Sequence, residues 1–499
     1  MMPEPPLKLS TGTVGLDAIL GGGIDPGRVY LIEGTPGTGK TTLALSFLLE
    51  GVRRRDATLY ITLSESEDEL RAVASSHGWS LDGIDVFELA PPSGLDGEGE
   101  QSVLHPAELE LGETARAVMD RVRARNPARV VFDSLSEIRL LAENPQRYRR
   151  QVLALKRFFA QQGCTVLLLD DHSSNSVQSG GDLQLHSMVH GVVTLEQIAR
   201  DYGAERRRLR IVKLRGSPFR GGYHDFVIRR GGIAVHPRLV AQDYHTAFDH
   251  ARVSTGNAGF DQMLGGGLNP GTNTLLIGPS GAGKTTTTTS ALVAALRRGG
   301  RAAYFLFDEG LPTLLARSAA LGMDLRPFVE NGQLSLRQID PAEMSPGEFA
   351  HRVRHAVERD GARFVAIDNL NAYMQSMPGE QYLLLQMHEL LTYLNQQGVI
   401  TFLVVGQHGL VGPVTTAVDL SYLADAILLL RYFEADGEVR KAVSVVKTRT
   451  TAHERTVREF AIGPQGLSVG APLTGMQGVL SGLPAWTGAL VPPGAAGPG

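Results

Sequence analysis

Short apolar runs alternate along this chain with longer segments in which apolar residues recur at helical spacing. The runs lie at residues 59–63, 130–132 and 165–169 in the first half, and at 303–307, 364–367 and 400–405 in the second. Continuous apolar runs are typical of strands buried on both faces of a sheet. Strands that alternate with amphipathic helices build a mainly parallel sheet covered by helices. The pattern therefore predicts an α/β fold.

The pattern occurs twice. Residues 10–17 and 20–23 match residues 254–261 and 264–267 at an offset of 244. Further along the offset falls to 234 or 235, so the first copy holds about nine extra residues, which we place at 91–101. The repeat predicts one domain over residues 7–240 and a second over 251–470, joined by a linker near 241–252. We expect residues 471–499 to form a disordered tail, because their Gly/Pro-rich end cannot build a core.

Composition narrows the class of protein. Hydrophobic residues make up 42% of the chain and charged residues 20%, as in ordinary globular proteins. The single cysteine, Cys164, excludes an intrachain disulfide, and no signal-peptide pattern begins the sequence. No apolar stretch approaches the ~20 residues that span a bilayer, so we expect a cytoplasmic protein without a membrane partner. Each half has a net charge of −2, which argues against nucleic acid as a partner.

Each copy contains one phosphate-binding loop of the form G-x-x-x-x-G-K-[ST] between an apolar strand and a helix. In such a loop backbone N–H groups surround phosphate oxygens, the lysine reaches the β- and γ-phosphates, and the hydroxyl helps to hold Mg²⁺. A Gly-rich turn that binds nothing is the alternative, which the strand–loop–helix context disfavours. The predicted ATP-binding residues are Gly34, Thr35, Pro36, Gly37, Thr38, Gly39, Lys40, Thr41 and Thr42, and Gly278, Pro279, Ser280, Gly281, Ala282, Gly283, Lys284, Thr285 and Thr286.

Two aspartates end apolar strands at similar distances after the loops. They are Asp133 and Asp368. A P-loop enzyme needs such a carboxylate to orient the Mg²⁺ shell, so we predict metal sites at Thr41 with Asp133 and at Thr285 with Asp368. The alternative is an aspartate that caps the following helix.

Acidic residues follow the second strand of each copy. Glu65 and Glu309 are equivalent at the offset of 244, and Asp308 stands where the first copy has Ser64. A carboxylate near the γ-phosphate can orient or deprotonate a water or hydroxyl nucleophile. We predict catalytic roles for Glu65, Asp308 and Glu309. The alternative is acid in the first turn of a helix, which the helix dipole favours.

A Lys-x-Arg sequence closes each copy. Lys213 and Arg215 in the first copy match Lys447 and Arg449 in the second. The chain has only seven lysines against 41 arginines, yet four lysines form two repeat-equivalent pairs, in the loops and here. Alternation along a strand puts both cations on one face. They are either a solvated strand end or a cationic finger for the γ-phosphate, supplied in cis or by a neighbouring subunit.

These features together resemble the KaiC family of RecA-type ATPases over roughly residues 7–470. The resemblance implies two tandem RecA-like domains, a homohexameric double ring with ATP between subunits, and Kai-type or other signalling partners. It implies slow hydrolysis in the first copy and Ser/Thr autophosphorylation in the second. The family's acceptor positions, aligned through residues 424–430, fall on Ser421 and Tyr422, and Thr415 and Thr416 are alternative acceptors.

Three functions remain open from the sequence. The first is a KaiC-like ATPase that hydrolyses ATP with Mg²⁺, autophosphorylates on Ser/Thr in the second domain, and acts as a signalling or circadian-type switch. The second is a RecA/RadA-type recombination or repair ATPase that DNA stimulates, which the charge balance disfavours. The third is a scaffold ring that binds ATP without turnover, which the matched glutamates disfavour.

Overall fold

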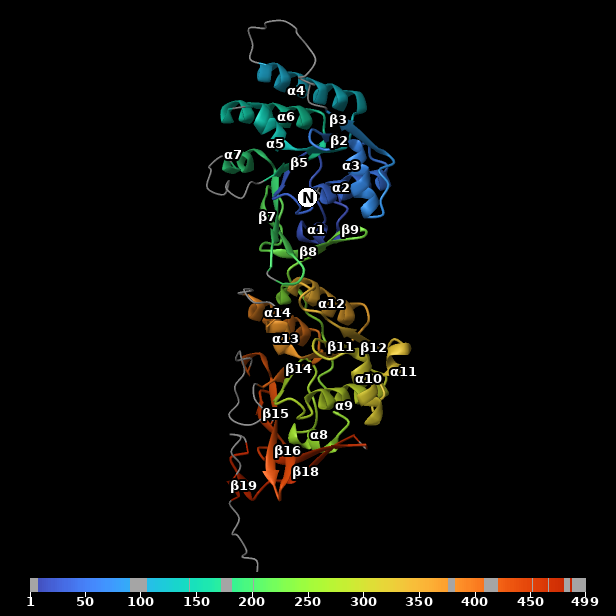
Figure 1. The fold of residues 1–499 in the computed structure, drawn as a ribbon, viewed down its shortest axis with the longest axis vertical. Helices are drawn as coiled ribbons and strands as arrows, with labels where there is room; N and C mark the ends of the chain where they lie inside the picture. Colours follow the sequence, from blue (N-terminus) through green and yellow to red (C-terminus); the bar gives the residue numbers. More distant parts are fainter. Residues whose placement is uncertain are drawn as a thin grey trace, which may run out of the picture. The chain divides into compact units, whose positions relative to one another are not determined.

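The computed structural model describes residues 8–89, 106–142, 144–171, 182–200, 202–375, 382–407, 421–450, 452–464, 466–479 and 485–486. The insertion expected at 91–101 lies outside these ranges, as do Thr415 and Thr416. The chain divides into two compact units, Met1–Arg238 and Leu239–Gly499 (Figure 1). Every helix in the described ranges falls short of the length and apolarity needed to cross a membrane.

The first unit contains a nine-stranded sheet with the order β3-β2-β4-β5-β1-β6-β7-β8-β9. The strands from β3 to β6 run parallel, and β6 to β9 continue as an antiparallel meander. Their bounds are β1 (Val29–Gly34), β2 (Thr58–Thr62), β3 (Ile84–Glu88), β4 (Arg129–Asp133), β5 (Thr165–Asp171), β6 (Gly191–Ile198), β7 (Arg206–Leu214), β8 (His224–Arg229) and β9 (Gly232–His236).

Helices cover both faces of this sheet. The residues of β1 to β5 alternate between two buried clusters, one shared with α1 to α3 and the other with α4 to α7. This alternation explains why the strands read as continuous apolar runs. The helices are α1 (Val14–Ile19), α2 (Lys40–Arg54), α3 (Glu67–Ser76), α4 (Pro106–Arg125), α5 (Leu135–Ala142), α6 (Pro145–Gln161) and α7 (Asp182–Met188).

The second unit repeats this topology, with the order β12-β11-β13-β14-β10-β15-β16-β17-β18. Its strands are β10 (Asn273–Gly278), β11 (Ala302–Leu306), β12 (Leu334–Gln338), β13 (Phe364–Asp368), β14 (Ile400–Gly406), β15 (Ala426–Ala435), β16 (Glu438–Thr448), β17 (Arg458–Gly463) and β18 (Gly466–Pro472). Its helices are η2 (Ala241–Asp243), α8 (Ala258–Met263), α9 (Lys284–Arg297), α10 (Leu311–Ala320), α11 (Arg326–Glu330), α12 (Pro346–Glu358), α13 (Leu370–Gln375), α14 (Leu383–Gln396) and η3 (Ser421–Leu423).

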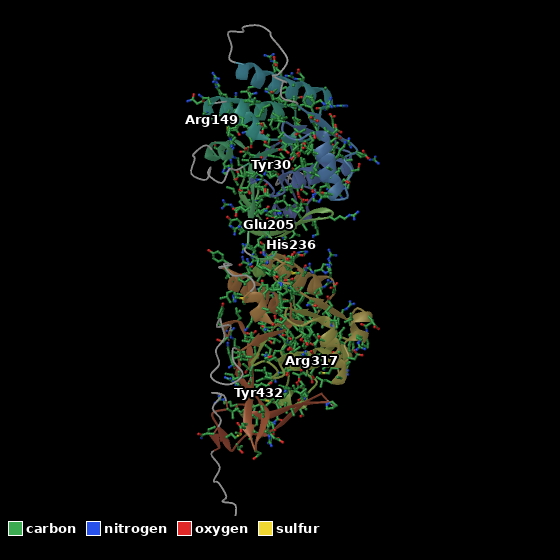
Figure 2. The ribbon with its side chains drawn as sticks, in the orientation of Figure 1. Tyr30, Arg149, Glu205, His236, Arg317 and Tyr432 are labelled. Atoms are coloured by element: carbon green, nitrogen blue, oxygen red, sulfur yellow. The ribbon has the colours of Figure 1, made fainter. Side chains whose placement is uncertain are left out.

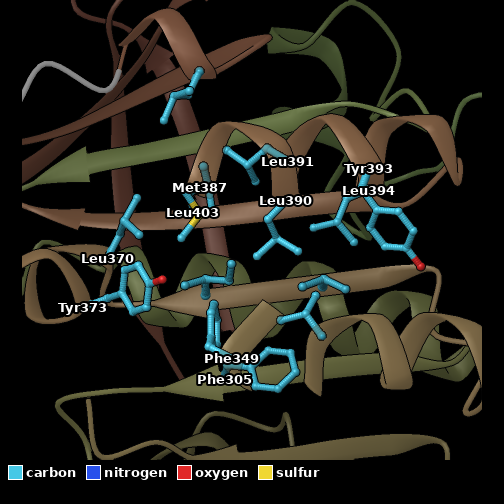
Figure 3. Close-up of a cluster of buried hydrophobic side chains, with 14 of the residues drawn as sticks. Phe305, Phe349, Leu370, Tyr373, Met387, Leu390, Leu391, Tyr393, Leu394 and Leu403 are labelled. Atoms are coloured by element: carbon cyan, nitrogen blue, oxygen red, sulfur yellow. The ribbon is translucent and has the colours of Figure 1, made fainter. Parts of the chain in front are cut away.

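The core beneath α12, α13 and α14 shows how the second sheet is covered. Leucines of α14 and Tyr373 of α13 pack toward Phe305 on β11 and Leu403 on β14 (Figure 3). Phe349 of α12 meets Phe305 edge-on, with ring centroids 5.5 Å apart, a favoured aromatic arrangement. The opposite face of the sheet packs against α8, α9 and α10. The predicted α/β class, with two mainly parallel sheets flanked by helices, is confirmed.

Described residues at both ends of the second unit pair or pack with their neighbours. The expected linker contributes Tyr244, whose ring meets Tyr393 edge-on at 5.2 Å. In the expected tail, β19 (Met476–Gln477) pairs with β20 (Ala485–Trp486), and Val479 is buried against Phe433. Val479 thus shares a small buried cluster with Phe433 on β15 and Ala442 on β16.

Candidate functional site

Each phosphate-binding loop needs glycine for its backbone and for space. Gly39 has a φ of 98° and Gly283 a φ of 108°, in the left-handed region. A Cβ on Gly39 would lie 2.6 Å from Ile228 Cδ1, and one on Gly283 would lie 2.7 Å from Ile462 Cδ1. Side chains of the antiparallel strands β8 and β17 therefore pack directly against the loops and restrict their conformation.

The loops join β1 to α2 and β10 to α9, so each points its backbone amides along a helix N-terminus. Lys40 and Lys284 are the first residues of these helices, and each is followed in the first turn by two of the predicted threonines. Lys40 Nζ donates to the first two carbonyl oxygens of its loop at 3.0 Å, and Lys284 Nζ does so at 2.8 Å. Both ammonium groups thus fold back over the concave side of the loop.

A carboxylate pairs with the lysine of the first loop. Asp171 Oδ1 lies 2.6 Å from Lys40 Nζ. Asp171 ends β5 opposite Gly34 of β1, and the matching position on β14 is Gly406. Among the described residues the second loop therefore has no counterpart of this ion pair.

The two strand-end aspartates are buried beside the loops. Tyr60 donates its hydroxyl to Asp133 Oδ2 at 2.5 Å, and Tyr304 donates to Asp368 Oδ2 at 3.0 Å. Burial raises the pKa of Asp133, opposed by the hydrogen bond from Tyr60. Burial likewise raises the pKa of Asp368, opposed by hydrogen bonds from Thr285 and Tyr304.

The two tyrosines that donate to these aspartates were not predicted from the sequence. Tyr60 and Tyr304 stand at the offset of 244 and are fully buried in β2 and β11, the neighbours of the strands that carry the aspartates. The matched hydroxyls inside two otherwise apolar runs were the available signal, because a buried tyrosine hydroxyl requires a partner.

The two candidate catalytic glutamates have different surroundings. The backbone of Glu65 is held by Thr62, whose Oγ1 accepts from Glu65 N at 3.0 Å. Burial raises the pKa of Glu65, and the nearby Asp133 raises it further. Its Oε2 is buried without a hydrogen-bond partner in the described structure. Glu309 instead accepts a hydrogen bond from Arg317 Nη2 at 2.8 Å.

A cavity of about 530 Å³ gathers the second-copy residues. Asp308 is fixed in its wall by Asn369, which donates to its carboxylate at 2.8 Å. Tyr432 on β15, which is labelled in Figure 2, donates its hydroxyl to the Ser280 carbonyl at 3.1 Å and so supports the loop. The predicted residues that line the cavity are Ser280, Gly281, Gly283, Lys284, Thr285, Thr286, Asp308, Glu309 and Asp368. Arg317, which the sequence analysis did not select, also lines it.

The Lys-x-Arg side chains bind backbone carbonyls of their own unit. Lys447 Nζ donates to the carbonyls of Ser421 and Ala424 at 2.8 and 2.9 Å, and Arg449 donates to that of Tyr422 at 2.8 Å. Neither cation is among the described residues that line the second-copy cavity. Within the unit they cap the turn that carries the candidate phosphoacceptor Ser421, in η3.

The first copy repeats these contacts. Lys213 donates to the carbonyls of His186 and Val189, and Arg215 donates to that of Ser187 at 2.6 Å. Burial lowers the pKa of Lys213, and the neighbouring Arg215 lowers it further. The duplicated geometry shows that the motif organises the turn before β6 and before β15.

A sheet of this order, with a phosphate-binding loop, a buried strand-end aspartate and an adjacent glutamate, occurs twice in one chain. These features define a tandem P-loop ATPase with two RecA-like domains. A family model described as "ATPase: KaiC" matches residues 9–240 and 253–474. The chain therefore belongs to the KaiC ATPase family.

Curated relatives extend over nearly the whole chain. The circadian clock protein KaiC3 of Synechocystis sp. is 27% identical over 492 residues, covering 96% of this chain and 95% of the relative. The circadian clock oscillator protein KaiC of Acaryochloris marina is 28% identical over 490 residues, covering 96% and 91%. The similarity thus spans both copies together.

Proposed function

We propose that both copies bind ATP with Mg²⁺ and hydrolyse it, and that the second copy also transfers phosphate to Ser421 of a neighbouring subunit. The observation that carries this proposal is the cavity beside the second loop, where Lys284, Asp368 and Glu309 converge. Phosphoryl transfer needs a cradle for phosphate, a carboxylate for the metal shell and a group that orients the nucleophile. The cavity holds one of each.

The residues present suit Mg²⁺. This ion takes oxygen ligands, with few from the protein and the rest from water and phosphate. The described residues contain no group of three or more His, Cys, Asp or Glu that could hold a metal ion, and a nucleotide-linked Mg²⁺ needs none. Asp133 and Asp368, with Thr41 and Thr285, would supply its protein ligands. When bound, the ion would neutralise charge that develops on the phosphates.

Glu65 is the proposed proton acceptor of the first copy. The oxygen of an attacking water bonds to the γ-phosphorus while the bond to ADP breaks, and the water's proton passes to a carboxylate oxygen. A carboxyl with a raised pKa is a better base than an ordinary one, and Glu65 Oε2 holds no competing hydrogen bond in the described structure. In the second copy the acceptor is Glu309, with Asp308 beside it, and the nucleophile is water or the hydroxyl of Ser421.

The family resemblance and the names of the relatives support a proposal for assembly and biological role. The relatives are named as circadian clock proteins, and we propose that this chain forms a homohexameric switch that works with Kai-type or other signalling partners in the cytoplasm. In that assembly each Lys-x-Arg pair would orient its turn, or its own cations, toward nucleotide on a neighbouring subunit. The pairs are Lys213 with Arg215 and Lys447 with Arg449. Both pairs donate hydrogen bonds to backbone carbonyls of these turns, and this repeated contact supports a fixed orientation of the turns.

Steady-state hydrolysis tests the core of the proposal. Lys40→Ala combined with Lys284→Ala should abolish ATP turnover, and Lys8→Ala is the matched control because Lys8 binds the Leu20 carbonyl outside the loops. Turnover that survives the double substitution contradicts the assignment. A wild-type protein that binds ATP without turnover identifies the scaffold ring.

Phosphopeptide mapping after incubation with ATP tests the kinase part. Phosphate on Ser421 that disappears in Ser421→Ala, and persists in Tyr422→Phe, is the expected result. Absence of phosphate from residues 415–422 in a protein that still hydrolyses ATP would remove the autokinase activity from the proposal and leave the ATPase.

A further inference from the structure

One position beside the candidate catalytic glutamates differs in charge between the copies. Helices α3 and α10 follow Glu65 and Glu309 at the same spacing, because the offset of 244 holds through both. At the position eight residues after the glutamate, the first copy has Val73 and the second has Arg317. Val73 packs against the buried cluster of the first unit, whereas Arg317 faces the cavity.

Arg317 holds the carboxylate of Glu309. Its Nη2 lies 2.8 Å from Glu309 Oε2, and the side chains are 39% and 21% exposed. In the first copy, Glu65 Oε2 is buried and has no hydrogen-bond partner among the described residues. A guanidinium donor occupies a lone pair that proton acceptance needs.

We infer that Arg317 is a positioning residue that restrains Glu309 as a proton acceptor and so makes hydrolysis in the second copy slower than in the first. This inference rests on the proposed function, since it assigns the difference between two ATPase sites to a single side chain. Glu65 takes the proton of the attacking water directly. Glu309 must first lose its hydrogen bond with Arg317, which lines the cavity.

The expected size of the effect follows from exposure. A partly exposed ion pair stabilises its carboxylate only modestly, so the restraint corresponds to about a two- to fivefold difference in turnover.

The charged groups that act on Glu65 are Asp133, Glu69, Asp171 and Lys40. An arginine in place of Val73 would add one cation to this set and shift the acid limb of the pH–rate profile to lower pH.

Reciprocal substitutions test the inference in full-length protein. Lys40→Ala leaves the second copy as the only intact loop, and Lys284→Ala leaves the first. In the Lys40→Ala background, Arg317→Met should raise kcat about two- to fivefold, and Arg317→Lys should keep the parental rate because it keeps the cation. In the Lys284→Ala background, Val73→Arg should lower kcat and move the acid limb to lower pH, whereas Val73→Met controls for packing.

The outcomes separate this inference from the proposed function. No turnover in the wild-type protein defeats the proposed function itself. Turnover that Arg317→Met leaves unchanged or slows overturns the inference alone, as does a Val73→Arg variant with the pH profile of Val73→Met. A rise in kcat that Arg317→Lys shares also overturns it, because the effect would then belong to cavity shape and not to charge.

Discussion

Replacing Asp171 with glycine should strengthen nucleotide binding in the first copy. Asp171 Oδ1 lies 2.6 Å from the ammonium of Lys40, the group expected to reach the β- and γ-phosphates. Because a carboxylate in this place resembles a phosphate oxygen, it competes with the nucleotide for the lysine. The second copy has Gly406 at the equivalent strand position, so Asp171→Gly makes the first site like the second.

The structure limits the size of this effect. Two unit charges 2.6 Å apart attract by about 1.6 kcal/mol at the permittivity of water. The side chain of Asp171 is 41% exposed, so most of that attraction is offset by hydration and side-chain entropy, which leaves about 0.2–1 kcal/mol. Removing the pair should therefore tighten binding by up to about fivefold, and the gain should shrink at high salt.

Fluorescence titration with a labelled ADP analogue measures this in the Lys284→Ala background, where only the first loop is intact. The reverse substitution, Gly406→Asp in the Lys40→Ala background, is the matched control and should weaken binding. It is sterically tolerable, since a Cβ on Gly406 would lie 3.5 Å from Asn369 Nδ2. Weaker or salt-independent binding by Asp171→Gly would refute competition and indicate that Asp171 assists the nucleotide.

Three further predictions concern the buried groups. Asp133→Asn should raise the thermal midpoint of the nucleotide-free protein at neutral pH. Because burial raises the pKa of Asp133 in the folded protein, the ionised carboxylate destabilises the fold at pH values above that pKa. The increase in thermal midpoint should therefore vanish as the pH falls toward the ordinary pKa of a carboxyl group. Tyr60→Phe should lower Mg²⁺-dependent turnover roughly tenfold with little change in ADP affinity, and equal losses in both would contradict a role through Asp133. Gly283→Ala should abolish nucleotide binding by the second copy in equilibrium titration, because its φ of 108° and the nearby Ile462 exclude a side chain; retained binding would show that the loop adapts.

Local patterns made much of the fold predictable. The strand, loop and helix around Lys40 are consecutive in sequence, so their glycines and apolar periodicity identify the element without knowledge of distant residues. The same holds around Lys284. The antiparallel strands β8 and β17 were not predicted, although their side chains hold both loops in shape. Their sequences mix apolar and polar residues, most of which are partly exposed, so the continuous apolar runs of the parallel sheet have no equivalent there.

The duplication, the fold class, the two phosphate-binding loops and the strands that end in Asp133 and Asp368 are all predictable from local sequence patterns. Which charged side chains form ion pairs depends on the tertiary structure. Strand order brings the end of β5 beside β1, so Asp171 reaches Lys40, and α10 turns Arg317 toward Glu309. A motif consists of neighbouring residues, whereas an ion pair depends on the spatial order of elements that are distant in the chain. Two copies of one motif therefore surround their nucleotide sites with different electrostatics.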